Sequence, residues 1–141
     1  MPNKEQKVKV LMETTQRADG QTDRQSLTYE GTFYQKDQSA HLIYKEEGST
    51  AHIRIGEGEV HVHRLGSLSG DLWFVRGDER DSRYETPYGR MILTVATDSL
   101  DWNPLKKQLL IRYRLLAGDQ LLSENEMMIK MEDIEENEKS C

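Results

Sequence analysis

The sequence predicts one all-β domain whose antiparallel strands close into a barrel. Apolar residues recur at every second position, turn-forming residues separate these segments, and only the stretch 101–108, which opens at Asn103-Pro104, favours a helix. A period of two is the repeat of a strand with one buried face. A length of 141 residues suits one domain. We expect residues 1–141 to form about 8–10 strands, with a short helical turn near 101–108 and flexible ends at 1–6 and 133–141.

The alternating segments occur from one end of the chain to the other. In order, they contain Val8, Val10 and Met12; Leu27, Tyr29, Gly31 and Phe33; Ile53 and Ile55; Val60 and Val62; Met91, Leu93 and Val95; and Leu109, Ile111, Tyr113 and Leu115. Turn signals lie between them at Asp19-Gly20, Gly56-Glu57-Gly58, 66–70, Gly77-Asp78, 86–89 and 117–119. This order favours sequential hairpins.

Two hairpins have a register that side-chain chemistry predicts. A turn at Glu57-Gly58 sets His52 opposite His63 and Arg54 opposite His61. A turn centred on Asp119 pairs Arg112 with Glu126, Arg114 with Glu124, Leu109 with Ile129 and Ile111 with Met127. Burying the apolar row contributes on the order of 1.5–3 kcal/mol per large side chain, against about 0.2–1 kcal/mol for each cross-strand charge pair. Burial therefore sets the register, and the charges agree with it.

Closure into a barrel is favoured over an open sandwich, which remains the alternative. The segments 89–100 and 106–116 are long enough for a continuously coiled sheet. Gly31 interrupts an otherwise strong strand pattern, where a sheet can bend sharply. Closure also removes exposed edges that invite aggregation.

Several fragments occur in a characteristic order. They are Gly31-Thr32-Phe33-Tyr34, Tyr44-Lys45-Glu46, Glu57-Gly58-Glu59-Val60, Arg64-Leu65-Gly66, Phe74-Val75-Arg76-Gly77, residues 84–89, and a closing hairpin with Tyr113 and Asn125. Together they resemble the YwiB-like family of small Gram-positive bacterial proteins, a domain of unknown function, over roughly Val8 to Met131. The resemblance implies a calycin-like, or lipocalin-like, barrel and no catalytic residue. The lipocalin Gly-x-Trp signature is not present, because Phe33 follows Gly31-Thr32.

Charge and cysteine content limit the partners and the compartment. The formal net charge is −6, which disfavours nucleic-acid binding by bulk charge. No stretch approaches the ~20 apolar residues of a membrane span, and the first residues lack the apolar core of a secretory signal. The single cysteine, Cys141, excludes a disulfide within these residues. We therefore expect a cytoplasmic protein with no cofactor, no nucleic acid and no membrane contact.

Three histidines are the main candidates for a metal site. The register above places His52, His61 and His63 on one face, and three imidazoles can bind zinc. The opposite face carries the apolar residues, so we expect the imidazoles to face solvent without the carboxylate that orients a metal ligand. Arg54 adds a positive charge nearby. The sequence therefore favours a solvated sheet face and no metal site.

Other chemical motifs are weak. The stretch from Trp73 to Arg90 mixes aromatic side chains with arginines, as single-strand nucleic-acid sites do, but carries as many acidic as basic residues. A strand, a charged loop and a Tyr-Pro turn explain it better. The stretch 66–70 has Leu68 where a nucleophile elbow requires serine. We expect no catalytic residue and no enzyme.

The barrel interior is the remaining candidate site. The strand registers direct five polar side chains inward: Tyr29, Tyr44, Tyr113, Ser123 and Asn125. An apolar lumen with a few convergent polar groups is typical of a small-ligand site. Narrow barrels are also often filled by their own side chains, which would leave a scaffold for a protein partner. Both functions remain open: a binding module for a small, partly apolar molecule, and a non-enzymatic interaction scaffold.

Overall fold

The computed structural model describes residues 5–134, which form a closed antiparallel barrel of ten strands. The strands are β1 (Gln6–Ala18), β2 (Gln21–Lys36), β3 (Ser39–Glu46), β4 (Ser49–Gly56), β5 (Glu59–Gly66), β6 (Ser69–Val75), β7 (Glu79–Thr86), β8 (Gly89–Asn103), β9 (Gln108–Ala117) and β10 (Gln120–Asp133). Each strand pairs with the next in sequence, and β10 pairs with β1. The predicted single barrel is therefore confirmed, and the sandwich is excluded.

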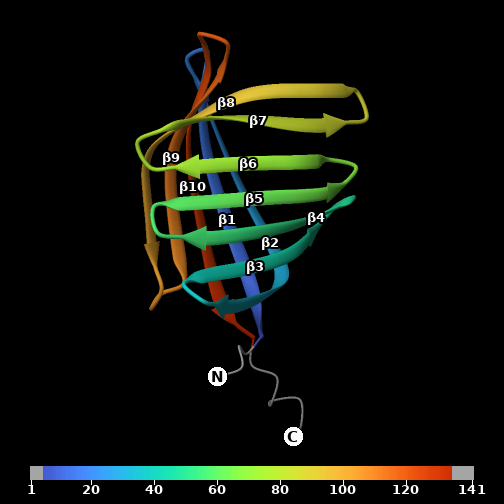
Figure 1. The fold of residues 1–141 in the computed structure, drawn as a ribbon, viewed down its shortest axis with the longest axis vertical. Helices are drawn as coiled ribbons and strands as arrows, with labels where there is room; N and C mark the ends of the chain where they lie inside the picture. The colour runs from blue at the N-terminus through green and yellow to red at the C-terminus, as the bar shows by residue number, and fades with distance from the viewer. Residues whose placement is uncertain (1–4, 135–141) are drawn as a thin grey trace, which may run out of the picture.

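The barrel is flattened into two layers whose strands cross steeply. In Figure 1, β3 to β6 run across the view in front of β1, β9 and β10, which run nearly along the long axis. β2 passes between the layers, since it pairs with β1 up to Phe33 and with β3 from Gly31 onward. Gly31 lies at this corner, as expected. A Cβ atom there would lie 2.7 Å from the Ile43 carbonyl oxygen, so the close approach requires glycine.

Both predicted registers are present. His52 lies opposite His63 in the β4–β5 hairpin, and Arg112 lies opposite Glu126 in the β9–β10 hairpin. The turn of the second hairpin is Gly118-Asp119, and a β-bulge between Leu121 and Ser123 shifts the pairing to the predicted register. The bulge keeps the apolar row of β10 facing the core.

The helical turn expected near 101–108 is wrong. Residues 101–103 complete β8, and a turn follows. The Asn103 side-chain oxygen accepts hydrogen bonds from the backbone N–H groups of Leu105 and Lys106, each at 3.1 Å. Such a side-chain bond replaces the backbone bond that would continue a helix. Across residues 5–134 no helix is long and apolar enough to cross a membrane.

The described chain includes part of the ends that were expected to be flexible. Gln6 and Asp133 belong to strands, and the Ile134 N–H donates to the Lys7 carbonyl at 3.0 Å. The rest of the segments expected to be flexible, 1–4 and 135–141, lies outside the described residues. The core lies inside the barrel and contains residues from both layers, including Val10, Ile53, Val60 and Ile129.

Candidate functional site

Charged and phenolic side chains point into the barrel from β3, β5 and β7, each separated from the next by one strand of the sheet. Glu46 follows Tyr44 by two positions on β3, and Arg64 follows Val62 by two positions on β5, so each shares the inward face. Tyr84 is buried on the inward face of β7. The same alternation that buries the apolar core therefore directs these polar groups into the lumen.

Arg64 and Glu46 form a largely desolvated ion pair. Arg64 Nε donates to Glu46 Oε1 at 2.8 Å, and Arg64 Nη2 donates to Oε2 at 3.4 Å. The two side chains are 16% and 19% exposed. Arg64 Nη1 donates to the Tyr84 hydroxyl at 2.9 Å. Burial of Arg64 favours its neutral form, but the bond to Glu46 and the field of Tyr84 outweigh burial and raise its pKa.

Tyr29 and Tyr44 lie beside this ion pair, as the predicted inward faces require. Their ring centroids are 4.8 Å apart. Tyr44 is 2% exposed, and no group of residues 5–134 has hydrogen-bond geometry to its hydroxyl, although the Arg64 guanidinium lies close enough to act on its pKa. Burial and the carboxylate of Glu46 raise the pKa of Tyr44, and the nearby guanidinium of Arg64 offsets part of the rise. The phenol is therefore held neutral, with a proton available to an acceptor.

Tyr113 reaches the same region from the back layer. It lies opposite Thr97 and Asn125 on its two neighbouring strands. Its ring meets Phe74 of the front layer edge-on, with centroids 4.9 Å apart. Burial raises the pKa of Tyr113 to about 12, against a smaller lowering by Arg64. Tyr113 therefore points inward and contacts the front layer through Phe74.

Ser123 and Asn125 also point inward on β10. Both are buried, and Asn125 Nδ2 donates to Ser123 Oγ at 2.9 Å. Asn125 is the cross-strand neighbour of Tyr113. These two residues therefore border the polar cluster on the side of Tyr113.

The predicted inward residues fall into two groups, one around Tyr44 and one around Tyr113, and both groups meet at Arg64. Its charge acts on Tyr29 and Tyr44 on one side and on Tyr113 on the other. Sequence analysis missed three members of this interior cluster, which are Glu46, Arg64 and Tyr84. The available signal was the alternation itself, because extending the pattern of Val60 and Val62 by two residues places Arg64 inside.

Two further buried hydroxyls border the interior cluster. Thr97 lies opposite Tyr113, and Ser82 precedes Tyr84 by two positions on the inward face of β7. Within the described chain neither hydroxyl has a hydrogen-bond partner, and the same is true of the Tyr44 hydroxyl. Buried polar groups usually have partners, so these hydroxyls are free to bond a bound molecule.

A hollow of about 400 Å³ opens at the other end of the barrel. Its walls include the inward-facing Ala40, Ile55, Leu100 and Trp102. A buried layer that includes Ile53 separates it from Arg64 along the strands. None of the buried hydroxyls without a partner in the described chain lines this hollow. The interior cluster, rather than the hollow, therefore holds the hydrogen-bonding chemistry.

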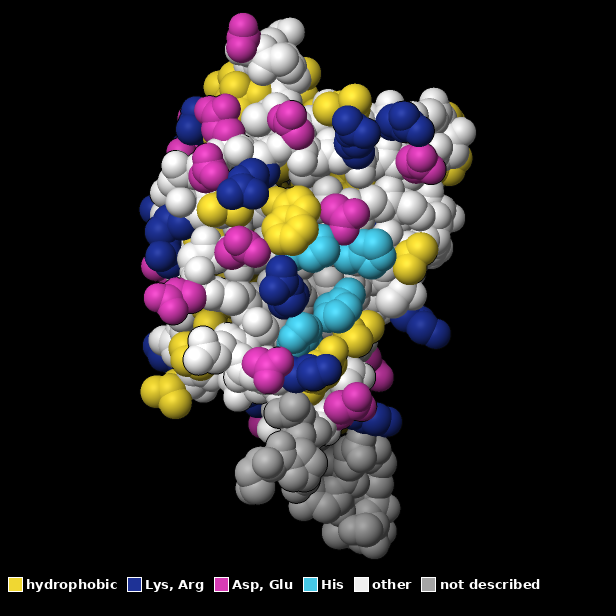
Figure 2. Space-filling model, in the orientation of Figure 1, with side chains coloured by type: hydrophobic (Ala, Val, Ile, Leu, Met, Phe, Trp, Pro, Cys, Tyr) yellow, Lys and Arg dark blue, Asp and Glu magenta, His cyan; other side chains and the backbone are white. Residues whose placement is uncertain are grey.

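The histidines lie together on the outer face of the front layer. Figure 2 shows the histidine side chains side by side on this face. His52 and His63 are opposite each other, as predicted. His41, which sequence analysis did not include, lies on β3 with its Nδ1 3.0 Å from His52 Nε2. The predicted placement outside the barrel is therefore correct, but the group is larger than expected.

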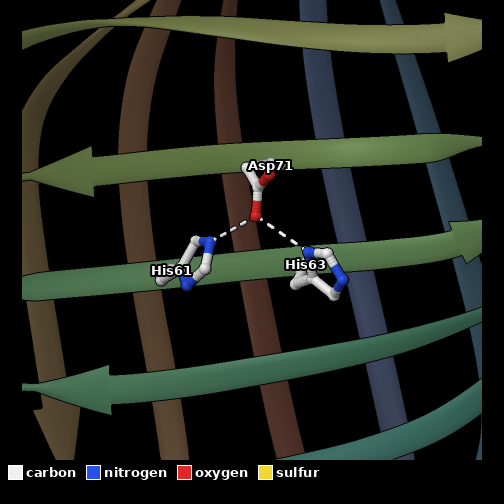
Figure 3. A group of neighbouring side chains, drawn as sticks. All are labelled: His61, His63 and Asp71. Carbon is white, nitrogen blue, oxygen red and sulfur yellow. Dashed lines mark hydrogen bonds and ion pairs between the residues drawn. The ribbon is translucent and has the colours of Figure 1, made fainter.

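The expectation that these imidazoles lack a carboxylate is wrong. His61 Nε2 and His63 Nδ1 lie 2.6 Å and 2.9 Å from the same oxygen, Asp71 Oδ1 (Figure 3). Asp71 lies on β6 directly opposite His63. Burial favours the protonated carboxyl, but the hydrogen bonds from His63 and His61 outweigh burial and lower the pKa of Asp71. Sequence analysis missed Asp71 because the register of β5 with β6 was not assigned.

The aromatic side chains of the stretch 73–90 do not form one platform. Trp73 stacks on His61 outside the barrel, at 3.9 Å between centroids. Phe74 and Tyr84 are buried inside. Tyr88 is 99% exposed in the β7–β8 turn. The aromatic side chains of this stretch therefore lie in three separate places and form no continuous stacking surface.

A closed meander barrel with a polar cluster inside its lumen defines the class of this protein. The chain belongs to the family described as Domain of unknown function (DUF1934), whose model matches residues 10–129.

The chain is similar to the uncharacterized beta-barrel protein YwiB of Bacillus subtilis (strain 168). The two are 29% identical over 96 residues, which cover 64% of this chain and 68% of that protein. The crystal structure of the YwiB protein from Bacillus subtilis matches with a TM-score of 0.84 at 24% identity, covering 93% of this chain and 94% of the other. The structural match supports the same barrel fold and leaves activity open.

Proposed function

We propose that this protein is a non-catalytic binding module that holds a small, partly apolar molecule inside the barrel. The molecule would place a hydrogen-bonding group against the interior cluster and its apolar part against the surrounding core, as lipocalins use their lumen. The observation that carries this proposal is the Tyr44 hydroxyl, which is buried beside the Arg64–Glu46 pair and has no partner in the described chain. This hydroxyl offers both a donor and an acceptor to a ligand.

The energetics of the interior cluster support a functional role. Desolvating two charges costs several kcal/mol per ion, and apolar residues of similar volume often stabilise a protein as well or better. Arg64 and Glu46 are nevertheless placed within a lumen that is mostly apolar. Perturbed titratable groups of this kind gather at functional sites.

The histidines are separated from the interior cluster, and this separation favours a binding role over a catalytic one. All four histidines lie on the outer face of β3, β4 and β5. The interior cluster therefore has arginine, glutamate and phenols but no imidazole base among its described members. A nucleophile and an adjacent base within hydrogen-bond reach, which covalent catalysis requires, are not brought together there. We place the protein in the cytoplasm as part of the same proposal, consistent with its single cysteine.

The alternative function is an interaction scaffold with a filled barrel. It is favoured by apolar side chains exposed around the β7–β8 hairpin, where Tyr88, Met91 and Ile92 are 99%, 45% and 58% exposed. In this alternative the interior cluster would only position the strands, and a protein partner would cover the hairpin.

A thermal-shift screen against a metabolite library separates the two functions. A ligand that binds only the folded state raises the melting temperature. Tyr44→Phe and Tyr113→Phe each remove one interior hydroxyl, and Tyr88→Phe removes an exposed one as the matched control. We expect the interior variants to reduce the ligand-induced shift while the control retains it. An absence of any stabilising compound, or equal loss in all three variants, would contradict interior binding and favour the scaffold.

A further inference from the structure

We propose that His61, His63 and Asp71 form a binding site for one Zn²⁺-like divalent transition-metal ion on the outer face of the barrel. The proposal is independent of the interior ligand, because the site lies on the opposite face of the sheet. It rests on the geometry in Figure 3, where two imidazoles of β5 and one carboxylate of β6 converge.

The three side chains have the spacing that a metal requires. His61 and His63 are two residues apart on one strand and therefore share a face. Asp71 pairs with His63 across the sheet. One candidate ligand atom from each residue lies within 4.8 Å of the others. A single cation can therefore contact all three with small side-chain rotations.

The donor set determines the metal class. Imidazole nitrogen suits zinc and its neighbours, whereas Ca²⁺ and Mg²⁺ prefer all-oxygen sites. Two histidines and one carboxylate are three protein ligands, which leaves a tetrahedral ion one position for water. The three side chains are 21%, 44% and 46% exposed, in the order His61, His63 and Asp71, so solvent reaches that position.

The hydrogen bonds from His61 and His63 to Asp71 already orient the three side chains toward a common point. Asp71 Oδ1 accepts from His61 Nε2 and from His63 Nδ1, so both rings already face the carboxylate. Metal binding requires these nitrogens to present lone pairs. Each nitrogen therefore gives up its hydrogen, either to the other ring nitrogen through the opposite tautomer or to solvent. The cation then replaces the two hydrogens between the rings and Asp71.

Neighbouring groups hold the rings in place. Trp73 stacks on His61 at 3.9 Å with the planes 7° apart, which fixes the orientation of that ring. His52 lies opposite His63 on β4. Arg54 is drawn toward Glu59, at 3.5 Å.

Zinc titration of the full chain tests the assignment. After dialysis against a chelator, Zn²⁺ is added and binding is followed by calorimetry, with Co²⁺ absorption reporting the coordination geometry. We expect one ion per chain and a Co²⁺ spectrum typical of a four-coordinate site. His63→Ala and Asp71→Asn should each weaken zinc binding by at least about tenfold. The matched control His41→Gln, on the same face but outside the three residues, should bind zinc as the parent chain does.

Other outcomes would overturn the site. Binding that is equally weak in the parent chain and in Asp71→Asn would show that His61, His63 and Asp71 form a hydrogen-bonded cluster only. Equal loss in His41→Gln would show diffuse binding by the histidine face rather than by the three residues. Far-ultraviolet circular dichroism of each variant checks that the barrel is intact, and the exposed position of Asp71 makes Asp71→Asn the safer of the two variants.

Discussion

Arg64 and Glu46 face each other inside the lumen from strands that are not neighbours in the sheet. Their shortest contact is 2.8 Å, although β3 and β5 are separated by β4. Both side chains reach across Ala51, which lies opposite Tyr44 on β3 and Arg64 on β5 and is fully buried. The small alanine thus leaves space for a charged pair inside an apolar barrel.

Removing one partner of this pair should cost more stability than removing both. Glu46→Leu leaves the Arg64 charge desolvated and unpaired, and we expect a loss of about 3 kcal/mol. The double variant Glu46→Leu with Arg64→Met should lose much less, because no lone charge remains. Urea unfolding of the parent, both single variants and the double variant gives the coupling energy. Additive losses would show that the two charges do not support each other.

Two interior tyrosines should respond oppositely to loss of the hydroxyl. Tyr44→Phe removes a buried hydroxyl that has no partner in the described residues, so we expect stability unchanged or raised by up to about 1 kcal/mol. Tyr84→Phe removes the acceptor of an Arg64 hydrogen bond, so we expect a loss of about 1–2 kcal/mol. Denaturant unfolding of the unliganded protein measures both. A clear loss in Tyr44→Phe would mean that its hydroxyl is bonded in solution.

Alkaline pH should destabilise the barrel partly through Tyr113. Its pKa is about 12 in the folded chain, against about 10 for an unfolded tyrosine. Because the folded state favours the neutral phenol, this contribution is complete below the unfolded value and is lost as the pH rises through the folded one. Unfolding free energies at about pH 9 and pH 11.5 should fall more for the parent than for Tyr113→Phe. Equal losses of unfolding free energy in the parent and in Tyr113→Phe would show that the phenol is exposed to water in the folded state.

The corner at Gly31 should not tolerate a methyl group. Gly31→Ala puts a Cβ 2.7 Å from the Ile43 oxygen, and we expect a loss of about 1–3 kcal/mol from overpacking. Gly56→Ala is the matched control, because its Cβ would lie 3.7 Å from the Glu59 oxygen, which is ordinary contact. Thermal and urea unfolding compare the two. Equal effects would show that glycine is not needed at the corner.

Local patterns were sufficient for much of this structure. The alternation of apolar residues predicts the strands, and the two-residue turn at Glu57-Gly58 sets the His52–His63 pairing. The Arg112–Glu126 pairing follows from burial of the apolar row, and the bulge between Leu121 and Ser123 brings the strands into that register. The inward positions of Tyr113 and Asn125 followed from the same rule. The error at 101–108 arose where the side chain of Asn103 satisfies backbone groups that a helix would otherwise use.

By itself, then, the sequence determined which residues face inward, since strand periodicity is a property of neighbouring positions along the chain. Only the tertiary structure decided which inward or outward residues touch across several strands. Asp71 reaches the two histidines because the turn at 67–68, preceded by Gly66 at a positive φ, sets the pairing of β5 with β6. Arg64 reaches Glu46 and Tyr84 because β3 and β7 are each separated from β5 by one strand, so long side chains on the shared inner face can meet across that strand.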